Sequence, residues 1–111
     1  MTKFVLIVLA SLAIVACHGP PPLVAFEAGP PLRLVAAPGV RINARLKPAL
    51  ELDDGTVLRF DSPRVTSDLA YFAAAPTVAA PLSGGRLGTL RLSVCPSGQA
   101  ICRLLVMRVA W

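Results

Sequence analysis

Histidine and paired carboxylates, which perform much of the acid–base chemistry in enzymes, are almost missing from this sequence. The chain has a single histidine, His18, and its one pair of adjacent acidic residues, Asp53-Asp54, precedes a glycine in a pattern typical of a turn. Gly84-Gly85 is also typical of a turn, and no glycine-rich phosphate-binding motif is present. These absences argue against classical hydrolase chemistry, which needs a base beside a nucleophile or two opposed carboxylates.

Charged residues make up only 15% of the chain, and they do not gather into one basic patch. The formal net charge is +5, from eleven lysines and arginines against six acidic residues, but apart from Lys3 the basic residues occur singly between Arg33 and Arg108. Binding to nucleic acid relies on clustered cations that neutralise phosphates. We therefore interpret the scattered arginines as solvated strand faces and expect no nucleic-acid partner.

No apolar run reaches the roughly 20 residues that a helix needs to span a bilayer. The longest run, Phe4 to Ala16, contains only one polar residue, Ser11, and follows the short basic start Met-Thr-Lys. This combination is typical of a secretory signal peptide. We therefore expect residues 1–16 to be a leader, and the mature chain to have no transmembrane helix.

The leader ends in Ile14-Val15-Ala16-Cys17, which resembles the lipobox of bacterial lipoproteins. The resemblance implies cleavage before Cys17 and a lipid on its thiol, so the chain would be held at the periplasmic face of a membrane. His18 follows the cysteine where an aspartate would mark inner-membrane retention, which favours the outer membrane. The alternative is an ordinary signal peptide with a cysteine there by chance.

Residues 17–31 form a proline-rich segment that we interpret as a tether. Residues 18–31 contain five prolines and two glycines, which favour extended backbone and remove donors for a sheet. Leu23 to Phe26 is the one stretch in it that could pair as a short edge strand.

Residues 32–111 show the pattern of a single all-β domain. The expected strands are 32–35, 40–46, 49–52, 56–60, 77–80, 87–94 and 104–109. Several alternate apolar with polar residues, and glycine and proline turns separate them at the spacing of a small β-sandwich. The only helix candidate is Ser67 to Ala75, where Ser67 or Asp68 could cap one or two turns.

The turn Asp53-Asp54-Gly55 also predicts a register. A three-residue hairpin loop with Gly55 in the left-handed conformation places Leu50 opposite Leu58 and Leu52 opposite Thr56. A two-residue loop would instead place Leu50 opposite an arginine, so we favour the longer loop.

Apart from Cys17, the chain has two cysteines, Cys95 and Cys102, which bracket six residues between two expected strands. In an oxidising compartment such a pair is able to form a disulfide. Two ligands at this spacing do not fit a zinc site, and His18 lies on the tether, so we expect no metal and no cofactor.

Strand alternation predicts where the two thiols point. Leu90, Leu92 and Val94 share one face of their strand, whereas Cys95 shares the other with Arg91. Cys102 falls in phase with Leu104, Val106, Arg108 and Ala110. We therefore expect Cys95 on the polar face at a strand end, where a partner could reach it.

The pair leaves two functions open. As a structural bond, a disulfide that closes a loop of about eight residues would stabilise the fold by roughly 2.5 kcal/mol through loss of loop entropy in the unfolded chain. As a redox pair, it would cycle between dithiol and disulfide.

Four features occur in a characteristic order: residues 38–44 (PGVRINA), residues 50–60 followed by Pro63, residues 88–95 (GTLRLSVC), and Cys102 before a closing strand. In this order they resemble the N-terminal periplasmic domain of the thiol:disulfide interchange protein DsbD and related domains. The resemblance covers about residues 35–111. It implies an immunoglobulin-like β-sandwich.

The same resemblance implies a function. In that family an exposed cysteine pair relays electrons from a membrane partner to periplasmic proteins, and Cys95 and Cys102 occupy the matching positions. Tyr71 and Phe72 would belong to a loop that shields the pair. The electron donor would be a separate thioredoxin-like or membrane redox protein. The competing hypothesis is a non-enzymatic envelope lipoprotein, a binding or assembly module with an inert disulfide.

Overall fold

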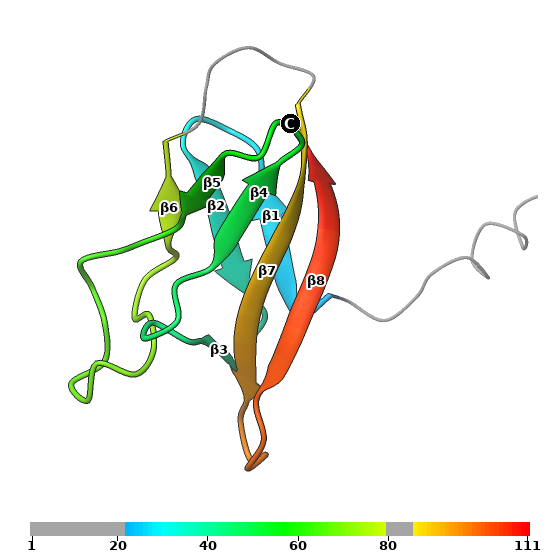
Figure 1. Ribbon diagram of the computed structural model, residues 1–111. Helices are drawn as coiled ribbons and strands as arrows, with labels where there is room; N and C mark the ends of the chain where they lie inside the picture. The colour runs from blue at the N-terminus through cyan, green and yellow to red at the C-terminus, as the bar shows by residue number, and fades with distance from the viewer. Residues whose placement is uncertain (1–21, 80–85) are drawn as a thin grey trace, which may run out of the picture.

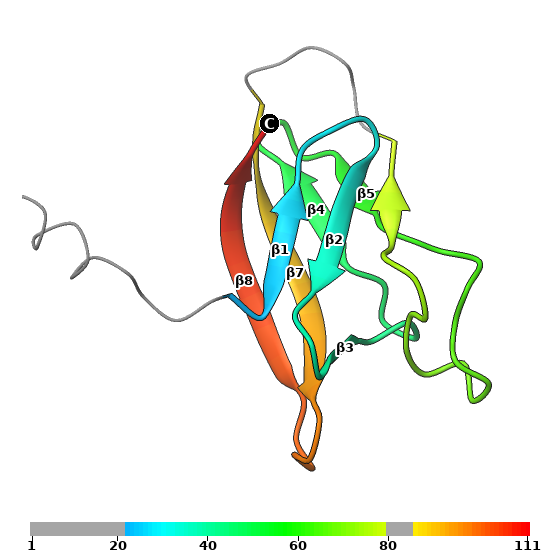
Figure 2. The ribbon, with the colours of Figure 1, turned by 180° about the vertical axis from the view of Figure 1, so that it is seen from behind.

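The computed structural model describes residues 22–79 and 86–111, and this part of the chain is an all-β sandwich (Figures 1 and 2). Sheet A has the order β1-β2-β6 and sheet B the order β3-β7-β4-β5, with β8 on the other side of β7. Sheet A consists of β1 (Val24–Glu27), β2 (Leu32–Ala36) and β6 (Thr77–Val78). Sheet B consists of β3 (Val40–Ile42), β4 (Ala49–Leu52), β5 (Val57–Arg59), β7 (Leu87–Pro96) and β8 (Arg103–Ala110). The predicted fold class is confirmed.

The core lies between the two sheets and is built by strand alternation. Leu32 and Leu34 of β2 face Leu50 of β4 and Leu90 of β7, and all four are fully buried. Phe60, just after β5, is the largest of the fully buried side chains. On β7 the predicted inner row of Leu90, Leu92 and Val94 is buried, whereas Arg91 is exposed.

The predicted hairpin register is confirmed. Leu50 lies opposite Leu58, and the Leu52 N–H donates to the Thr56 carbonyl at 2.8 Å. Gly55 has a φ of 93°, in the left-handed region where a side chain would be strained. The Asp54 carboxylate accepts the Thr56 N–H at 2.9 Å, which closes the turn. The acidic pair thus has a structural role.

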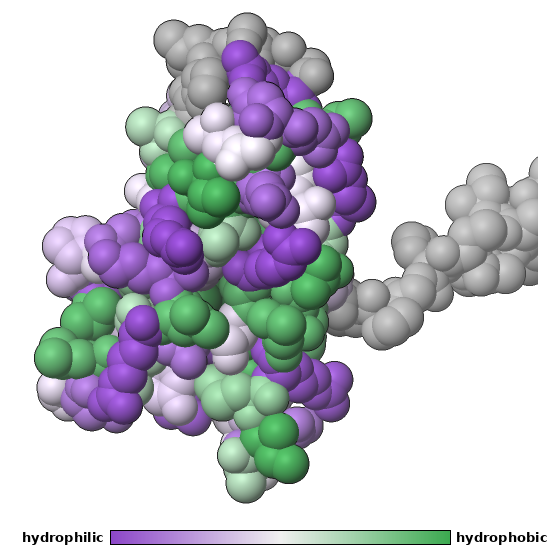
Figure 3. Space-filling view, in the orientation of Figure 1, coloured by the Kyte–Doolittle hydropathy of each residue, from purple (hydrophilic) through white to green (hydrophobic). Residues whose placement is uncertain are grey.

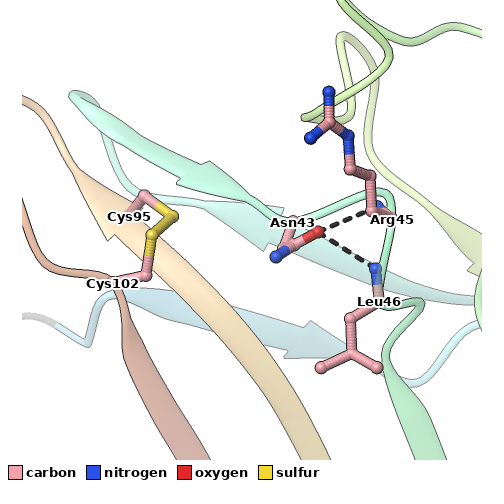
Figure 4. Close-up of a disulfide and its surroundings, with 5 residues drawn as sticks. All are labelled: Asn43, Arg45, Leu46, Cys95 and Cys102. Atoms are coloured by element: carbon pink, nitrogen blue, oxygen red, sulfur yellow. Dashed lines mark hydrogen bonds between the residues drawn. A yellow bond between two sulfur atoms is a disulfide. The ribbon is translucent and has the colours of Figure 1, made fainter.

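The strand predicted over residues 40–46 is wrong beyond Ile42, where β3 ends. The reason is Asn43, whose side-chain oxygen accepts the N–H groups of Arg45 at 2.8 Å and Leu46 at 3.0 Å (Figure 4). A short polar side chain that bonds its own following backbone offers an alternative to the strand ladder. The alternation of residues 44–46 therefore falls in a turn.

The helix predicted over Ser67 to Ala75 is wrong, because a tight loop forms there. The Asp68 carboxylate accepts the Thr66 hydroxyl at 2.6 Å and the Ala70 N–H at 3.1 Å, and these bonds, the Thr66 bond first, lower the pKa of Asp68. Leu69 takes the left-handed conformation, with a φ of 63°. A helix cannot continue through such a residue.

The remaining boundaries shift slightly. The edge strand expected at Leu23 to Phe26 is present as β1 one residue later, so ordered structure begins inside the segment assigned to the tether. The long pair β7 and β8 extends past both predicted strands. The turn expected at residues 83–85 lies outside the described residues. No helix in the described part of the chain is long and apolar enough to cross a membrane.

Candidate functional site

Cys95 and Cys102 form a disulfide at the end of the β7–β8 hairpin, beside its connecting loop (Figure 4). The β7–β8 ladder pairs Val94 with Arg103, so the next step of the same register places Cys95 directly opposite Cys102. The two Cα atoms are 4.2 Å apart. The predicted bond is confirmed, and it joins the cross-strand pair that follows Val94 and Arg103.

The backbone pattern explains why this cross-strand pair suits a disulfide. At the far end of the hairpin, Arg86 and Trp111 exchange both of their backbone hydrogen bonds. Antiparallel ladders alternate between hydrogen-bonded and non-hydrogen-bonded pairs, so stepping along the register makes Cys95 and Cys102 a non-hydrogen-bonded pair. Such pairs bring side chains closest together. Both cysteines consequently point to the outer face of sheet B, away from the core.

Access to the two cysteines is unequal. Cys95 is only 3% exposed, whereas Cys102 is exposed. The expectation that a partner could reach Cys95 is therefore wrong: alternation assigned its face correctly, but the residue is buried there. Cys95 lies between Cys102 on one side and Arg41 of β3 on the other. Cys102 is the sulfur-bearing residue that solvent reaches.

The connecting loop leaves that end of the hairpin open. Gly98 has a φ of 77°, and the Gln99 N–H donates to the Pro96 carbonyl at 3.3 Å, as in a tight turn with glycine at its third position. The Ser97 N–H donates to the Gly39 carbonyl at 2.6 Å and ties the loop to the start of β3. Ile101 is 76% exposed. The Ser97 bond therefore anchors the loop on the side of β3.

Arg41 and Tyr71 extend the row of side chains next to the disulfide. The Arg41 guanidinium carbon lies 4.1 Å from the centre of the Tyr71 ring, a cation–π contact. Tyr71 forms a backbone bridge with Asn43 and thus lies beyond β3. Across the outer face the order is therefore Tyr71, Arg41, Cys95, Cys102. The sequence signal for Arg41 was only its place in the segment Pro38 to Ala44.

Phe72, grouped with Tyr71 by the sequence, points elsewhere. It packs against the core and lines an open pocket of about 270 Å³ together with Leu34, Val40 and Ile42. No ionisable side chain lines this pocket, so it offers no acid–base or nucleophilic group. Of the two residues expected in a shielding loop, Tyr71 is the one near the disulfide, because it contacts Arg41 and Arg41 lies opposite Cys95.

At the end of sheet B that lies far from the disulfide, the outer face carries charged side chains. Arg91 of β7 contacts Glu51 at 3.2 Å. Arg108 of β8 contacts Asp53 at 2.9 Å, and this hydrogen bond, more than the charge itself, lowers the pKa of Asp53. Both ion pairs are about half exposed, so they contribute little stability. They mark a solvated end of the sheet opposite to the disulfide.

Two sequence-predicted residues, Cys17 and His18, lie outside the described residues. Within residues 22–79 and 86–111, no three histidine, cysteine or acidic side chains gather into a group that could hold a metal ion. Comparison of the chain with protein-family models, curated proteins and solved structures gives no match. The disulfide is the reactive group around which a function can be argued.

Proposed function

We propose that the chain is a thiol–disulfide relay in which Cys95 and Cys102 alternate between disulfide and dithiol. The observation that carries the proposal is the asymmetry of the pair: Cys102 is exposed at an open hairpin end, whereas Cys95 is covered. Exchange requires one sulfur that a thiolate can approach and a second that can leave. In this proposal Cys102 is the sulfur that is attacked, and Cys95 is the sulfur that leaves.

The exchange proceeds in two steps. A thiolate of a reduced thioredoxin-like or membrane redox partner attacks Cys102 Sγ, a bond forms between them, and the Cys95–Cys102 bond breaks with its electron pair on Cys95. The partner's second thiolate then attacks its own sulfur in the mixed disulfide and releases Cys102 as a thiolate. Water supplies two protons, the partner dithiol is oxidised, and this domain is reduced. The dithiol passes the two electrons to a client disulfide by the reverse sequence.

Arg41 supports the leaving group. It lies directly opposite Cys95 in the β3–β7 register, and cross-strand neighbours point to the same face with Cβ atoms about 4.5–5.5 Å apart. Arg41 thus adds a positive charge to the face on which Cys95 lies, and a cationic neighbour favours a thiolate over a thiol. The contact with the Tyr71 ring holds Arg41 on this face.

The surrounding fold supports the proposal that the bond opens without loss of structure. Eight residue pairs already join β7 to β8, and Cys95, although buried, is not part of the hydrophobic core cluster. Reduction therefore removes about 2.5 kcal/mol of loop-closure stabilisation but no core contact. A bond needed only as a structural cross-link has no use for an exposed cysteine.

The reduction potential of the pair tests the relay. We expect a value above about −300 mV, since structural disulfides lie below that and exposed exchanging ones are more oxidising. The pair is equilibrated with glutathione buffers, and the reduced chain is followed by far-ultraviolet circular dichroism, which should keep its strand spectrum. A lower potential together with unfolding on reduction would establish the inert disulfide of a non-enzymatic envelope lipoprotein instead.

We also propose that the relay is anchored by lipid on Cys17 at the periplasmic face of the outer membrane, because Ile14 to Cys17 has the pattern of a lipobox. Cys17→Ala should abolish partitioning into detergent and leave the leader uncleaved, since both modification and processing depend on that thiol. Metabolic labelling with a radioactive fatty acid measures the outcome. A cleaved, detergent-free Cys17→Ala product would contradict the anchor.

A further inference from the structure

The outer edge of β8 is unpaired in the described part of the chain. Among the strands that the structure describes, β8 pairs with β7 alone, through eight residue pairs. It forms the side of sheet B in both ribbon views (Figures 1 and 2). An exposed strand edge of this length is a template for another strand, and proteins usually protect such edges with charges, prolines or bulges.

The same residues that carry the free backbone groups also carry the outer-face side chains. Because Arg86 and Trp111 form a hydrogen-bonded pair, the residues of β8 that bond to β7 are those in phase with Trp111. Cys102, Leu104 and Val106 are in the opposite phase, so their N–H and C=O groups point away from β7. Their side chains lie on the outer face, and all three residues are exposed.

This row is apolar and unprotected. Leu104 is 65% exposed and Val106 is 55% exposed. Figure 3 views the outer face of sheet B and shows hydrophobic surface over β8 and at the end of the hairpin. Arg108, the next outer-face residue of β8 after this row, donates hydrogen bonds to Asp53 and Thr89. The row therefore offers hydrogen-bonding groups, two apolar side chains and a disulfide sulfur along one line.

We infer that the redox partner docks by adding an extended, cysteine-bearing segment antiparallel to the free edge of β8. The inference rests on the proposed relay and specifies its partner. The segment places its cysteine opposite Cys102 and apolar residues opposite Leu104 and Val106. In an antiparallel arrangement those apolar residues stand two and four positions before the cysteine. The partner motif is thus apolar, any residue, apolar, any residue, cysteine.

The geometry of this pairing suits the reaction. A residue opposite Cys102 on the free edge is in a hydrogen-bonded pair, for which the Cα atoms are about 5.5 Å apart. Disulfides bridge Cα atoms about 4.4–6.8 Å apart. The docked thiolate can attack Cys102 Sγ, form the mixed disulfide and release Cys95 as a thiolate without leaving register, and the partner's cysteine supplies the electrons.

Short peptides test the docking. The probe is a seven-residue peptide with valines two and four positions before its cysteine and threonines between them; its matched control has the valines one and three positions before. The rate of mixed-disulfide formation with the oxidised full chain is measured by acid quenching and mass spectrometry, and divided by the rate with glutathione. We expect the probe to react about tenfold faster than the control, from two added cross-strand pairs and their hydrogen bonds.

Two further comparisons separate docking from reactivity. Methylation of the backbone nitrogen two positions before the cysteine should remove the advantage, because that N–H faces β8, whereas methylation one position before should not. Leu104→Thr and Val106→Thr should also lower the ratio of peptide to glutathione rates. Val57→Thr, on the edge strand β5 at a similarly exposed valine, is the control. Circular dichroism shows that the variants fold.

The outcomes are distinguishable. Equal rates for probe and control, with normal glutathione exchange, would overturn the docking and leave the relay standing. Absence of exchange with every thiol, glutathione included, would overturn the relay and the docking with it. If sedimentation instead shows a dimer that Leu104→Thr dissociates, a second copy of the chain occupies the edge, and the partner segment is refuted.

Discussion

A chain that keeps only Cys102 should react with a disulfide reagent at least about 100-fold faster than a chain that keeps only Cys95, because thiolate reactivity follows access. The two chains are Cys95→Ser and Cys102→Ser, each in a Cys17→Ala background, and serine preserves side-chain size. Cys95 is 3% exposed and flanked by two strands, whereas Cys102 is exposed. The release of thionitrobenzoate from Ellman's reagent measures both rates.

The control for this comparison is denaturant. In concentrated guanidinium the two rates should converge, since unfolding removes the shelter of Cys95. After reaction with Ellman's reagent, the Cys95→Ser chain carries thionitrobenzoate on Cys102, and the single thiolate of a thioredoxin-like protein that lacks its second cysteine should displace it and leave a stable mixed disulfide at Cys102. Equal native rates, or trapping through Cys95 alone, would show that attack does not take place at Cys102 and would refute the division of roles.

Phe60→Ala should cost about 3–5 kcal/mol of unfolding free energy, the range for large aromatic side chains in cores. Phe60 is fully buried after β5, and its N–H donates to the Pro48 carbonyl at 2.9 Å. Small domains are stable by only about 5–15 kcal/mol, so this loss leaves the domain marginal. Chemical denaturation followed by circular dichroism measures it.

The matched comparison is Val57→Ala, a truncation three residues earlier on the exposed side of β5. It should cost less than about 1 kcal/mol, the full span of strand propensities. If the two substitutions destabilised the domain equally, Phe60 would not be a core residue and the packing of the two sheets would need revision.

Local chemistry made the β7–β8 hairpin and the 53–55 turn predictable. In both, residues close in sequence set the pairing: Gly55 supplies the left-handed residue that the loop needs, and alternation assigns Leu90 to the core and Cys95 to the outer face. The period of two residues is a property of the strand itself. It therefore holds whatever else the chain does.

Prediction failed where side chains bonded to nearby backbone. Asn43 ends β3 two residues after Arg41, and Asp68 with Leu69 builds a loop where a cap and a helix were expected. Asparagine and aspartate serve caps and turns by the same hydrogen bond. Their spacing alone does not decide between them.

The sequence by itself determined the all-β class, the face of Cys95 and the pairing of Cys95 with Cys102, because each depends on residues close along the chain. Only the tertiary structure decided which cysteine is accessible and which strand edge is free. Arg41, more than fifty residues before Cys95, comes to lie beside it through the β3–β7 pairing. Among residues 22–79 and 86–111, β8 has one neighbour, because β3 and β4 share the other side of β7. Exposure is a property of the whole assembly of strands, since what covers a side chain comes from distant parts of the sequence.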